Sequence, residues 1–113
     1  MNKFEEALEK YTTEFKNTIK IEVDVELLKK VTRGLGPSIY NQDSSKVSGS
    51  DKSELETVKQ NFLIKKLGLK DGPELDEAIQ DVMDQMGKSN RNKYRAMVYY
   101  LLTLKFNKAS IYN

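Results

Sequence analysis

Residues 88–104 read KSNRNKYRAMVYYLLTL, a stretch with four cations in its first eight residues and an apolar run after them. Between Arg95 and Leu104, only Arg95 and Thr103 are not apolar. A helix that is apolar on nearly every side is buried among other helices. The stretch therefore predicts a buried C-terminal helix, from about residue 90 to 106, at the centre of a small helical domain.

Four further segments repeat apolar residues at the three- and four-residue spacing of an amphipathic helix. The predicted helices span about residues 2–20, 24–34, 51–67 and 72–86. Asp24 and Asp51 stand where N-caps are expected, and Gly68 and Gly87 stand where helices end. Together with the helix at 90–106, these segments predict an all-α fold, a compact single-domain bundle of about five helices over residues 1–113.

Three stretches interrupt the helical pattern. Residues 41–50, NQDSSKVSGS, are polar and rich in serine, which predicts a loop. Residues 20–25, KIEVDV, alternate briefly as a β-strand does, so any departure from the all-helical prediction is expected there, as an extended segment. Pro37 after Gly36 ends the second helix, and another short helical turn is expected at residues 37–41.

The composition excludes several kinds of site. The 113 residues contain no cysteine and no histidine, which removes thiolate chemistry, disulfides and the commonest base and metal ligand near neutral pH. We therefore expect no catalytic residues, no cofactor and no metal. The longest apolar run is too short to cross a membrane, and the first ten residues lack the apolar core of a signal peptide. A cytoplasmic protein without a membrane partner is the expectation.

Two stretches of the chain, SGSDKSELETVKQNFLIKKLGL at residues 48–69 and NRNKYRAMVYYLLTLKFNKAS at residues 90–110, resemble the signature regions of a bacterial family. This family is the domain of unknown function 2853, and the resemblance covers about residues 24–112. It implies an all-helical bacterial protein and supplies no catalytic residues. Gly36 and Pro37 depart from the family's pattern.

Charge is balanced over the whole chain, with 19 basic and 17 acidic residues, but it is segregated near the C-terminus. Residues 71–86 carry six carboxylates and no base, whereas residues 88–113 carry six bases and no acid. Glu77, Asp81 and Asp84 share one face of the fourth helix and form a candidate acidic partner face. Because they point away from its apolar stripe, only flanking residues such as Glu74 and Asp76 are expected to reach the fifth helix.

The basic cluster at residues 88–95 is the second candidate surface. Lys88, Arg91, Lys93 and Arg95 would crowd the positive end of the helix dipole if the fifth helix begins near residue 90. An anion is expected to neutralise these four cations: a carboxylate of the acidic fourth helix, a partner's acidic surface, or a phosphate. Of these, the carboxylate within the chain is favoured.

These patterns favour a non-enzymatic helical interaction module with an unknown protein partner. The alternative is nucleic-acid or phosphate binding through residues 88–95, with Lys65, Lys66 and Lys70 as reinforcement. The residues MGKS at 86–89 contain part of a phosphate-loop motif, but the first glycine of that motif would fall at Val82 within a helix. Gly87 is therefore interpreted as the end of the fourth helix.

Overall fold

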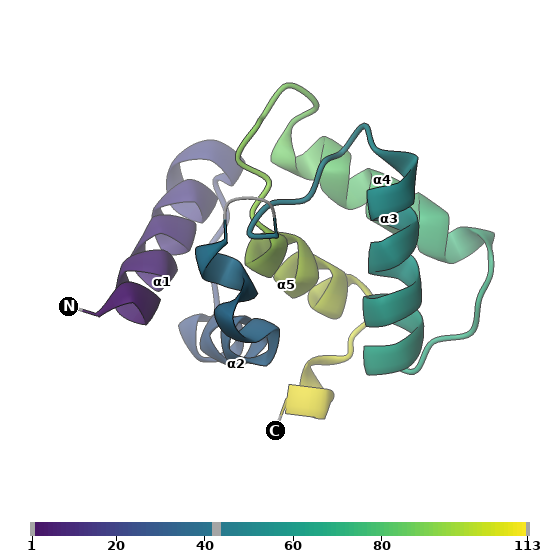
Figure 1. Ribbon diagram of the computed structural model, residues 1–113, viewed down its shortest axis with the longest axis horizontal. Helices are drawn as coiled ribbons and strands as arrows, with labels where there is room; N and C mark the ends of the chain where they lie inside the picture. Colours follow the sequence, from purple (N-terminus) through teal and green to yellow (C-terminus); the bar gives the residue numbers. More distant parts are fainter. Residues whose placement is uncertain (1, 42–43, 113) are drawn as a thin grey trace.

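The computed structural model describes residues 2–41 and 44–112, and this part of the chain contains five α-helices (Figure 1). They are α1 (Lys3–Glu14), α2 (Val25–Leu35), α3 (Lys52–Val58), α4 (Pro73–Met86) and α5 (Arg95–Lys105). Two short 3-10 helices, Gly36–Tyr40 and Ala109–Tyr112, follow α2 and α5. The described residues form no β-strand and contain one isolated bridge, between Lys46 and Tyr94. The all-α prediction is confirmed.

Helix α5 occupies the centre of the molecule, with the other four helices around it (Figure 1). Every residue from Ala96 to Thr103 is buried. The hydroxyl of Tyr100 accepts a hydrogen bond of 2.8 Å from the backbone amide of Asp24, which fixes the start of α2 against α5. Leu104 was expected in the core and is 45% exposed, because it lies in the last turn, where the surrounding helices no longer cover α5.

The predicted helix caps are present. Asp24 accepts a hydrogen bond from the amide of Leu27, and Asp51 accepts from the amides of Ser53 and Glu54. These bonds satisfy amides that have no partner within the first turn. Gly87 ends α4 with φ at 101°, a conformation that side chains disfavour, so the glycine is required there.

Two predicted helices change their winding part-way along. Residues Phe15–Ile19 continue α1 as a π-helix, and Lys59–Lys66 continue α3 in the same way. The amide of Leu67, for example, donates to the carbonyl of Phe62, five residues earlier. Apolar spacing predicted both helices but does not distinguish these windings, because the buried residues fall on one side in either case.

Residues 20–24 are irregular, with Lys20 in the left-handed conformation, and they form the break expected between the first two predicted helices. One boundary differs from the sequence prediction. Helix α5 begins at Arg95, not near residue 90, so most of the basic cluster precedes the helix. Within the predicted loop at 41–50, residues 42 and 43 lie outside the described residues.

Candidate functional site

The connection between α4 and α5 is a folded polar loop. The side chain of Asn90 donates a 2.9 Å hydrogen bond to the carbonyl of Met86 and accepts one of 2.8 Å from the amide of Asn92. The first bond satisfies a carbonyl left open at the end of α4, and the second closes a tight turn. Asn90 thus holds residues 87–94 away from helical geometry, which is why α5 starts late.

This loop is joined to the predicted polar loop through the backbone. The amide of Val47 donates to the carbonyl of Lys93 at 2.8 Å, and the amide of Arg95 donates to the carbonyl of Ser45 at 2.7 Å. These two bonds flank the bridge between Lys46 and Tyr94. Two loops that are more than 40 residues apart in the sequence therefore form adjacent walls of one surface feature.

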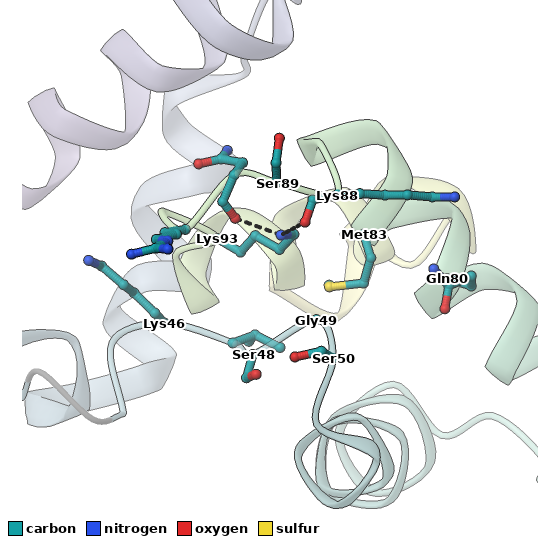
Figure 2. A pocket seen from close by; sticks show the side chains of 12 residues that line it. Lys46, Ser48, Gly49, Ser50, Gln80, Met83, Lys88, Ser89 and Lys93 are labelled. Carbon is teal, nitrogen blue, oxygen red and sulfur yellow. Dashed lines mark hydrogen bonds between the residues drawn. The ribbon is translucent and has the colours of Figure 1, made fainter.

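Between these walls lies an open depression of about 760 Å³, which we call the basic depression (Figure 2). Four cations line it: Lys46, Lys88, Arg91 and Lys93. Its other lining residues include Ser48, Ser50 and Ser89, and no described carboxylate is among them. The depression thus combines positive charge with hydroxyl donors.

Lys93 forms part of the floor of the basic depression. It is only 5% exposed, and its ammonium donates to the carbonyl of Asn90 at 2.6 Å and to that of Lys88 at 3.4 Å (Figure 2). No carboxylate of the described residues forms an ion pair with it. An ammonium has three N–H donors, so two carbonyls leave one donor and the full charge without a counterion.

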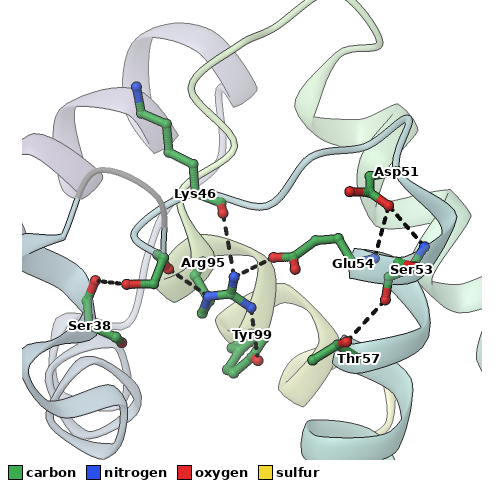
Figure 3. A network of polar contacts seen from close by, with 9 residues as sticks. Ser38, Lys46, Asp51, Ser53, Glu54, Thr57, Arg95 and Tyr99 are labelled. Carbon is green, nitrogen blue, oxygen red and sulfur yellow. Dashed lines mark hydrogen bonds and ion pairs between the residues drawn. The ribbon is translucent and has the colours of Figure 1, made fainter.

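Arg95 lies apart from this surface, although the sequence placed it in the same cluster. Its guanidinium forms an ion pair with Glu54 of α3 and donates to the carbonyls of Ser44 and Lys46 and to the hydroxyl of Tyr99 (Figure 3). Burial alone would lower the pKa of Arg95, but the hydrogen bonds to Tyr99 and Glu54 outweigh it and raise the pKa. A carboxylate of the chain therefore forms an ion pair with Arg95, as expected, but this carboxylate belongs to α3 and not to α4.

Lys88 and Arg91 are exposed, and neither forms an ion pair with a described residue. The expectation of four cations at a helix N-terminus is thus wrong, since only Arg95 lies within α5. Lys65 and Lys66 lie at the far end of the π-helical continuation of α3, and Lys66 sits 5.2 Å from the ring centroid of Tyr112. Neither they nor Lys70 line the basic depression, so they do not reinforce it.

The acidic row on α4 is exposed at Glu77, Asp81 and Asp84. Asp81 nevertheless forms an ion pair of 3.3 Å with Lys105 of α5, although it was expected to point away from that helix. Asp76 does not reach α5 and pairs with Lys59 instead. Within the described chain, no group of three acidic side chains is arranged to hold a metal ion.

Lys46 and Lys59 were not among the residues that the sequence patterns singled out. Lys46 completes the basic depression, but its loop carries no periodic signal and its partner segment is distant in the sequence.

Lys59 is 8% exposed and forms ion pairs with Glu56, Asp71 and Asp76. Burial alone would lower the pKa of Lys59, but hydrogen bonds to Asp71, Asp76 and Glu56 raise it to about 12. In the sequence, the one sign that Lys59 is buried was its position on the buried side of a predicted helix.

Comparison with protein families finds a match over residues 10–110 to the family described as "Protein of unknown function (DUF2853)". The chain belongs to this family. The match confirms the resemblance seen in the sequence and extends it towards the N-terminus. No match was found among curated proteins. Membership in DUF2853 therefore assigns the chain to a family without assigning it an activity, and the residues of the basic depression all lie within the matched region. No helix in the described part of this DUF2853 chain is long and apolar enough to cross a membrane.

Proposed function

We propose that the chain is a non-enzymatic binding module that holds an anionic group of its partner in the basic depression. The observation that carries this proposal is Lys93, a residue only 5% exposed, whose ammonium donates to two backbone carbonyls and has no carboxylate of the described residues to neutralise it. A buried charge is unfavourable unless it is paired and hydrogen-bonded. An anion in the depression would supply the missing charge and accept the remaining N–H.

The rim of the depression suits the same ligand. Lys46 and Arg91 belong to the two loops and line the depression, and the hydroxyls of its lining serines can donate to oxygen atoms. Hydrogen bonds between a cation and an oxyanion are roughly twice as strong as neutral ones. Because Lys88 and Arg91 have no ion pair in the described structure, no such pair has to break before an anion binds.

Binding is favoured over catalysis by the residue types present. Ser48, Ser50 and Ser89 line the depression, but the chain has no histidine to activate a serine. Lys93 already donates to two carbonyls, which suits a fixed hydrogen-bond donor and not a general base.

The proposal also includes a cytoplasmic location in a bacterium, and cell fractionation tests this location.

Calorimetric titration with tripolyphosphate tests the proposal. We expect binding that weakens between 50 and 200 mM salt, because screening reduces attraction between exposed charges. Replacing Lys46 and Arg91 together by glutamine should weaken the affinity about tenfold or more. Replacing exposed Lys16 and Lys70 by glutamine changes the net charge equally and should leave the affinity nearly unchanged. Equal losses in both double variants, or no binding by the wild type, would overturn the proposal.

A further inference from the structure

A second depression adjoins the basic one. It has a volume of about 930 Å³, and its lining includes Lys3, Lys10, Tyr40 and Tyr94. Lys46 lines both depressions, so the two meet at this side chain. Together the described linings carry six cations and a single carboxylate, Glu6. Positive charge therefore follows a path longer than one phosphate group requires.

Aromatic rings accompany the cations along this path. The ammonium groups of Lys10 and Lys46 lie 5.0 Å and 5.4 Å from the ring centroid of Tyr94. Tyr94 in turn packs against Tyr11, with ring centroids 5.3 Å apart. Tyr40, at the end of the 3-10 helix after α2, is 48% exposed and is the one aromatic ring among the exposed large apolar side chains of the described residues. The second depression thus offers fixed cations over an aromatic floor and one exposed ring.

We propose that the anionic ligand is single-stranded nucleic acid, with phosphates on Lys46, Lys88 and Arg91 and a base stacked on Tyr40. This inference rests on the proposed function and names the ligand class. Proteins that bind single strands combine a basic groove along the backbone with aromatic rings for the bases. An acidic peptide would use the cations equally well but would leave the ring of Tyr40 without a role. In a duplex the bases are already stacked on each other, so a single strand fits the exposed ring better.

Two of the six cations, Lys46 and Lys93, are held in place before a ligand arrives. Lys46 is held by the bridge to Tyr94 at its backbone and by the ring of Tyr94 near its ammonium. Lys93 is held by two carbonyls. Side chains that are ordered before binding lose less conformational entropy when the ligand arrives. Lys46, where the two depressions meet, is thus held at its backbone and near its ammonium, and it is the expected centre of the site.

Fluorescence anisotropy with a labelled 12-nucleotide oligouridine tests the inference. The wild type should bind this probe, and Tyr40→Ala should weaken the affinity by about fivefold or more, the loss expected for one base stack. Tyr40→Phe should keep most of the affinity, because it keeps the ring. A 12-unit abasic strand, which has the phosphates and no bases, should bind the wild type and Tyr40→Ala equally. Melting curves for each variant confirm that the exposed substitutions leave the fold intact.

The outcomes separate the two proposals. Tripolyphosphate binding without oligouridine binding, or oligouridine binding that does not change in Tyr40→Ala, would overturn the inference and leave the proposed function standing. Tighter binding of an oligoglutamate peptide than of oligouridine would overturn it as well and identify an acidic protein segment as the partner. Failure of every anionic probe would overturn both proposals.

Discussion

Arg91 and Arg95 are four residues apart and of the same type, yet they occupy different environments. Arg91 is exposed at the rim of the basic depression, whereas Arg95 lies in a network that ties the 44–47 segment, α3 and α5 together (Figure 3). The sequence identifies both as cations of one cluster. Only the tertiary partners, Glu54 above all, show that Arg95 stabilises the fold and that Arg91 is available to a ligand.

Replacement of Arg95 by glutamine should lower the free energy of unfolding by about 2 to 3 kcal/mol, because Glu54 and two carbonyls lose a charged donor in a mostly buried site. Arg91→Gln is the matched control and should stay within about 0.5 kcal/mol of the wild type, as exposed substitutions usually do. Urea unfolding measures both. Equal stability of the two variants would show that the network contributes nothing.

Replacement of Leu101 by alanine should lower the free energy of unfolding by about 2 to 5 kcal/mol, through lost burial and the cavity left behind. Leu101 is 5% exposed within the central helix. Leu104→Ala, three residues on, removes the same atoms from a side chain that is 45% exposed and should have a much smaller effect. A loss below half a kcal/mol for Leu101→Ala would contradict its place in the core.

Stability should fall as the pH rises from 10 to 12. Burial raises the pKa of Tyr11 to about 12, and Tyr94 and Tyr40 add to the effect. The unfolded chain loses this proton near pH 10, so the contribution of the neutral hydroxyl is complete below pH 10 and disappears by pH 12. Lys59, with its pKa raised to about 12, loses its ion pairs over a similar range. Tyr11→Phe should show a shallower decline in urea unfolding across this range; an unchanged slope would refute the assignment.

At the scale of elements, the helices were predictable, but the pairing between the two loops was not. Apolar spacing and the aspartate caps located all five helices, because both signals are local. The start of α5 was misplaced because Asn90 bonds within its own loop and because Val47 and Arg95 form backbone bonds to the other loop. Such long-range backbone pairing leaves no periodic trace in the sequence.

Replacement of Asn90 by alanine should therefore destabilise the protein by about 1 to 2 kcal/mol, since it removes two side-chain hydrogen bonds at the end of α4. It should also weaken tripolyphosphate binding, because the carbonyl of Asn90 positions the ammonium of Lys93. Ser89→Ala changes the neighbouring, exposed residue and should leave the free energy of unfolding nearly unchanged. Unchanged stability and binding in Asn90→Ala would mean that other bonds hold the loop.

At the scale of the whole molecule, a nearly neutral chain presents a strongly uneven surface. The net charge is only +2, but the fold collects cations around the two depressions, while α4 presents Glu77, Asp81 and Asp84 to solvent. The sequence indicated this segregation between α4 and the C-terminal region. It could not indicate Lys46, Lys3 or Lys10, which the fold brings to the basic loop from distant parts of the chain.

The most direct test of an anion site at the basic depression is a titration of the ¹⁵N-labelled protein with tripolyphosphate, followed through the backbone amide resonances. An anion site there predicts saturable shifts concentrated at residues 46–50 and 88–93, with the amides in the first turns of the acidic helix α4, residues 73–79, unaffected. Shifts spread evenly over all exposed lysines, or confined to the end of α3 near Lys65 and Lys66, would contradict it.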